Sequence, residues 1–143
     1  MVVKKRHRFW NVIIVITVLL SISAFTAHFK NWTKIESGQI KILSGFYYKK
    51  LNFTQLDSVL LIEKIPPMER LNGFSAFQKE KGLFREFKDS LTDSKVHVYV
   101  DNLANQKIKL VYGDSLKLYI NYTDSLKTTA LYEMLKAKIQ PPE

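Results

Sequence analysis

Cysteine is absent from this 143-residue chain, and glycine, proline and histidine are scarce, with five, four and three residues respectively. Without cysteine, the chain has no disulfide framework, no thiol nucleophile and no cysteine-ligated zinc or iron–sulfur site. The low glycine and proline content, together with 46% hydrophobic residues, excludes collagen-like, disordered and low-complexity classes. What remains is one globular domain with, at most, one short appendage.

Catalytic and metal-binding motifs are equally scarce. His7 and His28 flank an apolar run near the N-terminus, and His97 is the only histidine in the rest of the chain. A lone histidine that alternates with valines is predicted to be an exposed strand residue rather than a metal ligand or general base. The sequence also lacks a Gly-rich phosphate loop, a Gly-x-Ser-x-Gly elbow and a two-histidine helix motif. We therefore predict no enzymatic activity, no catalytic residue, no metal site and no cofactor.

The most pronounced feature that is present is an apolar run near the N-terminus. Residues 9–27 carry no charged side chain, and a helix of this length reaches about 28 Å, close to the hydrocarbon thickness of a bilayer. Its few polar residues are too mild to form the polar face of a soluble core helix. Trp10, Phe29 and Trp32 bracket the run, as interfacial aromatic residues do. We predict a transmembrane helix over residues 9–29, preceded by a basic N-terminus of residues 1–8.

A cleaved signal peptide has the same overall plan and is the alternative interpretation. Cleavage after Ala27 or Ala24 would place a bulky residue, Phe25 or Ile22, three positions before the cut. The apolar run is also longer than the usual core of a signal peptide. An uncleaved anchor is the preferred interpretation, and cleavage stays open as the alternative.

The charges that flank the run predict its orientation. A basic cluster between Lys4 and Arg8 precedes the run, whereas only Lys30 and Lys34 follow closely after it. Because the more basic flank stays in the cytoplasm, we predict a single-pass membrane protein with a cytoplasmic N-terminus and an extracytoplasmic domain. The alternative for the cluster is a nucleic-acid-binding arm, which would require an accompanying basic stripe with interleaved aromatic residues. No such stripe is present, so no nucleic-acid partner is predicted.

The rest of the chain has the alternating pattern of short strands, after a linker predicted over residues 30–37. Strands are expected over residues 39–43, 46–50, 58–64, 83–87, 95–100, 107–112 and 116–120. The expected fold is therefore mainly β, with about seven antiparallel strands in a sheet or partly open barrel. One helix at the C-terminal end would cover an exposed edge or open end of that sheet.

The C-terminal helix is predicted from a change of period. The apolar residues that fall on one helix face are Leu126, Ala130, Leu131, Met134, Leu135 and Ile139. Thr123 or Asp124 is expected to cap the start of a helix over residues 125–139, and residues 140–143 form a short tail.

The longest connection is predicted between Pro66 and Gly82, where Asn72-Gly73 and Gly82 act as breakers. Long ordered loops often carry function, so this loop is the candidate binding surface. Its proposed residues, together with one from the following strand, are Arg70, Asn72, Gly73, Phe74 and Arg85. The alternative is structural, with Phe74 and Phe77 folded over a barrel edge.

A basic group lies at the end of this loop. Lys79, Lys81, Arg85 and Lys88 alternate with Glu80 and Glu86. Interspersed charges of both signs indicate a solvated loop and strand face rather than an anion-binding site.

The order of these elements resembles a known family. The segments that carry the resemblance are the hairpin 40–48, Gln55-Leu56-Asp57-Ser58-Val59 running to Pro66, the Arg70–Phe74 and Gly82–Arg85 segments, strand 96–100 and the ending 118–135. Over residues 38–139 they are similar to a membrane-anchored bacterial pleckstrin-homology-like (PH-like) domain. The resemblance implies two nearly orthogonal antiparallel sheets in a partly open barrel, capped by the C-terminal helix. It implies no phosphoinositide site, because the first hairpin loop is only Ser44-Gly45 and holds no basic residue.

These observations predict a membrane-anchored, non-enzymatic binding or scaffold module that contacts a protein or peptide partner near the membrane. Barrel edges can accept an added strand from such a partner. One alternative is a small-ligand binder or enzyme that uses the 66–82 loop. Another is an accessory subunit of a larger membrane assembly.

Overall fold

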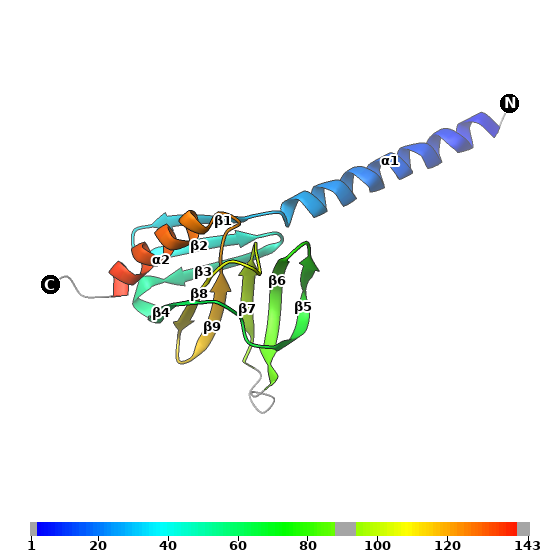
Figure 1. Cartoon of the computed structure of the whole chain (residues 1–143). Coiled ribbons are helices and arrows are strands. Elements are labelled where there is room, and N and C mark those ends of the chain that lie inside the picture. Colours follow the sequence, from blue (N-terminus) through cyan, green and yellow to red (C-terminus); the bar gives the residue numbers. More distant parts are fainter. Residues whose placement is uncertain (1–2, 88–93, 140–143) are drawn as a thin grey trace.

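The computed structural model describes residues 3–87 and 94–139. It consists of a long N-terminal helix, α1 (Val3–Ala27), a domain of two sheets, and a C-terminal helix, α2 (Ser125–Ile139). In Figure 1, α1 projects away from the domain while α2 lies against it, so the two helices have different roles. The prediction of a mainly β domain between an apolar helix and a C-terminal helix is confirmed.

Helix α1 is apolar after its basic first turns, and only its C-terminal end contacts the domain. Residues His7–Ala27 are long and apolar enough to cross a membrane, and the rest of the described chain buries none of this stretch. The hydroxyls of Thr17 and Ser21 donate hydrogen bonds to the carbonyls of Ile13 and Thr17, at 2.9 and 2.8 Å. The helix therefore satisfies these polar side chains itself, as a lipid environment requires. It ends at Ala27, two residues before the predicted boundary.

The smaller sheet has three antiparallel strands, β1 (Asn31–Glu36), β2 (Gln39–Ser44) and β3 (Tyr47–Asn52), in that order. The prediction of a linker over residues 30–37 is wrong, because β1 occupies most of that segment. Strand β1 is rich in polar residues and gains its order by pairing with β2, with Ile35 opposite Ile40 and Thr33 opposite Ile42. Gly38 makes the connecting turn at a positive φ of 85°.

The larger sheet has six strands in the order β4-β8-β9-β7-β6-β5. Their bounds are β4 (Leu56–Ile62), β5 (Met68–Ala76), β6 (Lys79–Glu86), β7 (Val96–Val100), β8 (Lys107–Tyr112) and β9 (Leu116–Ile120), and a 3-10 turn, η1 (Phe53–Gln55), precedes β4. Strands β7 and β9 pair in parallel. The described chain thus has nine strands in two open sheets, so the expectation of about seven, all antiparallel, is wrong in number and at this pair.

The predicted loop from Pro66 to Gly82 is also wrong, because most of it forms the β5–β6 hairpin. The residues that predicted a loop, Asn72-Gly73 and Gly82, lie inside β5 and β6. Asn72-Gly73 follows a register shift in β5, and a Cβ on Gly73 would come within 2.4 Å of the Lys81 carbonyl oxygen. The actual turn is Phe77-Gln78, a dipeptide with no turn-forming residue, although both φ angles are positive.

The core fills both faces of the larger sheet. On the first face, Tyr99, Leu110 and Leu118 pack with Ile40 of the smaller sheet and Leu135 of α2. On the second face, the predicted inward valines of β7 pack with Phe84 and Tyr119. The β4–β5 connection crosses this second face (Figure 1) and contributes Ile65, while Ile62 and Met68 contribute from the adjoining ends of β4 and β5. Both faces of the central strands are therefore buried.

The bounds and the cap of α2 match the prediction. The Asp124 carboxylate accepts a hydrogen bond from the backbone N–H of Leu126 at 2.9 Å. The packed face is rotated from the predicted one, because Thr128, Leu131 and Leu135 are buried whereas Leu126 is 78% exposed. Ala130 is exposed as well and lies beside the packed face.

Candidate functional site

A groove of about 590 Å³ lies between β1 and α2. Trp32, Thr33 and Ile35 form its strand side, and Ala130 and Met134 contribute from the helix. The apolar side chains Ile35 and Trp32 are both largely exposed. A groove of this volume has room for a few side chains of a ligand.

The backbone of β1 has a free edge, because β1 lies at the end of its sheet and pairs only with β2 in the described chain. Glu36 and Gln39 flank a two-residue turn, so they form a hydrogen-bonded pair. Hydrogen-bonded and non-hydrogen-bonded pairs alternate along an antiparallel ladder, so Lys34 and Trp32 are also in hydrogen-bonded pairs with β2. The N–H and C=O groups of Thr33 and Ile35 therefore point away from β2. By the same alternation the N–H of Asn31 points away from β2. It donates to the Asp101 carboxylate at 2.9 Å, which agrees with this assignment.

Hydrogen bonds between β1, Tyr122 and α2 hold the groove in shape. The side-chain hydroxyls of Thr33 and Tyr122 are hydrogen-bonded to each other. The backbone N–H of Tyr122 donates to the Thr128 hydroxyl of α2 at 3.0 Å. Burial raises the pKa of Tyr122, so its hydroxyl stays protonated at physiological pH and keeps its capacity to donate.

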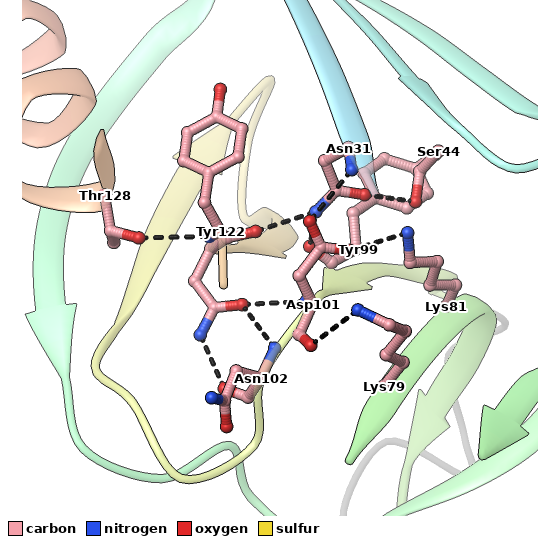
Figure 2. A network of polar contacts seen from close by, with 10 residues as sticks. Asn31, Ser44, Lys79, Lys81, Tyr99, Asp101, Asn102, Tyr122 and Thr128 are labelled. Carbon is pink, nitrogen blue, oxygen red and sulfur yellow. Dashed lines mark hydrogen bonds and ion pairs between the residues drawn. The ribbon is translucent and has the colours of Figure 1, made fainter. Parts of the chain in front are cut away.

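A buried polar network fixes the start of β1 next to the groove. The Asn31 side-chain amide donates to the carbonyls of Tyr99 and Asn121, at 2.5 and 2.8 Å, and accepts from the Ser44 hydroxyl at 2.5 Å. The Asn121 side chain in turn accepts from the backbone N–H of Asp101 at 2.8 Å. Figure 2 shows Asn31 beside Ser44 at the end of β2 and beside Tyr99 and Asp101 at the end of β7, so two other segments of the chain meet it.

The centre of charge in this network is Asp101. Lys81 Nζ lies 2.7 Å from Asp101 Oδ1, and the two side chains are 0% and 1% exposed. Lys79 Nζ donates to the Asp101 carbonyl at 3.2 Å, and Figure 2 shows both lysines approaching from β6. The prediction of a solvated basic face is therefore wrong for Lys79 and Lys81, while Lys88 lies outside the described residues. Burial lowers the pKa of Lys81, and the Asp101 carboxylate opposes that shift.

The end of α1 is attached to the domain through His28. Its Nδ1 lies 2.8 Å from the Ala24 carbonyl oxygen, and its buried ring packs edge-on against Phe46, 4.9 Å between ring centroids, and at 4.8 Å against Phe74. A Cβ on Gly45 would come within 2.4 Å of His28 Cδ2. The residue that directly follows α1 is thus packed against both the β2–β3 turn and β5.

This attachment predicts different effects for two glycine substitutions. Gly45 and Gly38 both have positive φ, but only Gly45 faces a side chain, since nothing lies within 4 Å of a Cβ on Gly38. Gly38→Ala should lower the free energy of unfolding by about 1–2 kcal/mol through backbone strain alone, and Gly45→Ala should lower it further by displacing His28. Denaturant titration of the full chain in detergent measures both values. In a His28→Ala background the extra effect of Gly45→Ala should disappear, and its persistence would contradict the contact.

The residues predicted as a binding surface do not form one loop. Arg70, Asn72, Gly73 and Phe74 lie on β5 and Arg85 lies on β6. Asn72 accepts a hydrogen bond from the Tyr47 hydroxyl at 2.9 Å, Arg85 pairs with Glu69 at 2.6 Å, and Phe74 packs on His28. None of the five lines the β1–α2 groove. Their role in binding stays a prediction, and the groove residues were missed because β1 was interpreted as a linker.

Comparison with known proteins adds no relative. No family model, no curated protein and no solved structure matches the chain. Within the described ranges, no three His, Asp or Glu side chains are grouped closely enough to hold a metal ion. The site is therefore interpreted from its geometry alone.

His97 is half-buried rather than exposed as predicted, because both faces of β7 are covered. Its Nδ1 lies 3.0 Å from the Tyr99 hydroxyl oxygen. Burial lowers the pKa of His97 to about 4, and the positive charges of Lys49 and Lys95 add to the shift. The imidazole of His97 is therefore neutral in the folded domain at physiological pH.

The depressed pKa of His97 predicts a pH-dependent stability. Between pH 6.5 and about 4 the unfolded chain protonates this histidine while the folded chain does not, so the free energy of unfolding should fall as the pH falls through this window. After allowance for solvent screening, the expected loss is about 1 kcal/mol. Denaturant titrations of the wild-type chain and His97→Gln at pH 7 and pH 4.5 measure it. The variant should lose less stability than the wild type, and equal losses would contradict the assignment.

Proposed function

We propose that this chain is a membrane-anchored, non-enzymatic binding module that takes an extended segment of a protein partner into the β1–α2 groove. The observation that supports this most directly is the free backbone edge of β1 beside a partly apolar groove. A partner strand would pair with the outward N–H and C=O groups of Thr33 and Ile35. Main-chain hydrogen bonds would provide affinity, and contacts with α2 would provide selectivity.

The lining of the groove favours a particular kind of segment. Side chains of an added strand alternate in direction, so every second one would face Ala130 and Met134 and should be apolar. Two carboxylates at the groove are already engaged, since Asp101 pairs with Lys81 and Asp124 caps α2. Lys30 and Lys127 also line the groove. An acidic residue in the bound segment would complement them.

The placement of the module follows from α1 and its flanks. The proposal includes α1 as an uncleaved single-pass anchor, with the basic N-terminus in the cytoplasm and the domain on the other side. It also retains the PH-like assignment, which the C-terminal helix packed against open sheets supports, while the parallel β7–β9 pair departs from that plan. The alternative of a small-ligand binder or enzyme that uses the 66–82 loop is less favoured, because most of that segment forms the β5–β6 hairpin.

Peptide selection against the full chain in lipid nanodiscs tests the proposed groove. Ile35→Pro removes an outward N–H but leaves the β1–β2 hydrogen bonds in place, and Ala130→Arg fills the groove. Leu60→Arg, at an exposed position on β4, is the control. Each groove variant should weaken the selected peptides at least about tenfold, or about 1.4 kcal/mol, while the control should leave affinity unchanged. Failure to select any peptide, or equal losses in the control, would contradict the proposal.

A further inference from the structure

Two hairpin tips expose phenylalanine beside the end of α1. Phe46, on the β2–β3 turn, is 71% exposed, and Phe77, on the β5–β6 turn, is 73% exposed. Figure 1 shows both turns at the end of the domain from which α1 departs. Phe46 packs against His28, just after the helix, and Phe77 packs against Phe25, inside it. The exposed rings therefore flank the helix terminus.

The contact with Phe25 determines the depth of Phe77 relative to the apolar helix. The ring centroids of Phe25 and Phe77 are 6.0 Å apart, and Phe74 lies 6.3 Å from Phe25. Phe25 belongs to the uncharged run and precedes the end of α1 by two residues, or about 3 Å along the axis. If α1 crosses a bilayer, Phe77 consequently lies at the level of the last turn of the span, where hydrocarbon meets the headgroups.

The backbone at Phe77 gives an independent reason to look for a contact outside the chain. Phe77 and Gln78 have φ values of 51° and 63°, a conformation that asparagine or glycine adopts far more easily. A bulky residue there strains the turn. Because the ring remains mostly exposed, the fold gains little packing to offset that strain.

The surrounding side chains suit a lipid interface. Phe29 and Trp32 follow α1 and are largely exposed. Lys30 Nζ lies 3.9 Å from the centroid of the Trp32 ring, which places a cation beside an amphipathic aromatic residue. Tryptophan and lysine are enriched at this depth, where the ring sits among headgroups and the ammonium reaches the phosphates.

We propose that Phe46 and Phe77 insert into the interfacial layer of the bilayer that α1 crosses and thereby hold the domain at a fixed tilt on the lipid surface. This inference rests on the proposed membrane anchoring but not on the peptide groove. The insertion adds two contact points to the single helix. It also fixes the direction in which the β1–α2 groove faces, since β1 begins only four residues after α1 ends.

The absence of cysteine from the chain allows a direct test with single labels. An environment-sensitive fluorophore is attached to Phe46→Cys or Phe77→Cys in the full chain, reconstituted in pure phosphatidylcholine vesicles. Phe87→Cys is the matched control. Phe87 is largely exposed, at 64%, as Phe46 and Phe77 are, but it follows the opposite end of β6. At 46 and 77 the label should be quenched by a lipid-borne nitroxide and should show a severalfold lower quenching constant for aqueous iodide than at 87. Equal iodide access at all three positions would overturn the inference.

Two further labels separate the possible failures. A label at Leu19→Cys reports α1 itself, so aqueous access there would show that anchoring fails, whereas lipid contact at 19 with aqueous access at 46 and 77 overturns only the insertion. A label at Ser75→Cys, an exposed position near the β5–β6 turn, should lose its lipid contact when Phe46→Ser and Phe77→Asn are added. Thermal unfolding should show that Phe77→Asn does not lower stability, because asparagine tolerates the positive φ. Shielding from iodide without quenching by the lipid nitroxide would indicate self-association and also overturn the inference.

Discussion

Asp101→Ala should lower the free energy of unfolding by about 3–5 kcal/mol. The substitution leaves the Lys81 ammonium fully buried without its carboxylate partner, which lies at 2.7 Å in the folded domain. It also removes the acceptor for the backbone N–H of Asn31 at the start of β1. Denaturant titration of the full chain in detergent, followed by near-ultraviolet circular dichroism, measures the loss.

A double variant provides the control for this effect. Lys81→Met removes the buried charge while keeping most of the side-chain volume, so Asp101→Asn combined with Lys81→Met should be more stable than Asp101→Ala. A loss below about 1 kcal/mol for Asp101→Ala would show that the pair is solvated, because exposed ion pairs contribute little. That result would contradict the burial of this network.

Leu135→Ala should destabilise the domain by about 2–5 kcal/mol, through lost burial and the cavity left behind. Leu135 is 0% exposed in the core cluster that joins α2 to both sheets. Leu126→Ala is the matched control, because Leu126 lies on the same helix but is 78% exposed, and its effect should stay within about 0.5 kcal/mol. Thermal or denaturant unfolding of the two variants in parallel measures the difference.

The same pair of variants connects stability to the groove. Leu135 does not line the groove, but it packs the helix that forms one wall. Under conditions where both variants are folded, Leu135→Ala should also weaken the selected peptides, while Leu126→Ala should not. Equal destabilisation by the two variants would mean that the packed face of α2 is assigned wrongly.

Local patterns in the sequence were sufficient for the strongly periodic elements. The helix from Ser125 to Ile139 and the strands β8 and β9 have the predicted bounds, because their apolar spacing follows one period with clear turn residues at the ends. Strand β1 was missed because its order comes from pairing with β2 rather than from its own polar residues. The β5–β6 hairpin was missed because its turn, Phe77-Gln78, contains no turn-forming residue.

The candidate site could not be predicted from local patterns. Its walls come from residues 30–35 and 122–134, which only the folded topology brings together. The burial of Lys79 and Lys81 could not be predicted for a related reason. Lys79 and Lys81 alternate with acidic residues as a solvated strand would, and only pairing of β6 with β7 brings them to Asp101. Whether such a lysine is solvated or buried depends on the partner that the sheet places opposite it, because a buried charge requires one.

Residue-resolved hydrogen exchange with a selected peptide tests the proposed strand addition most directly. In the full chain without peptide, the amides of Thr33 and Ile35 should exchange faster than those of Trp32 and Lys34. The register of the β1–β2 hairpin directs the N–H groups of Trp32 and Lys34 toward β2, where they are hydrogen-bonded. Peptide binding should slow exchange at Thr33 and Ile35 and leave Trp32 and Lys34 nearly unchanged. Unchanged exchange at Thr33 and Ile35 with bound peptide would contradict strand addition at β1.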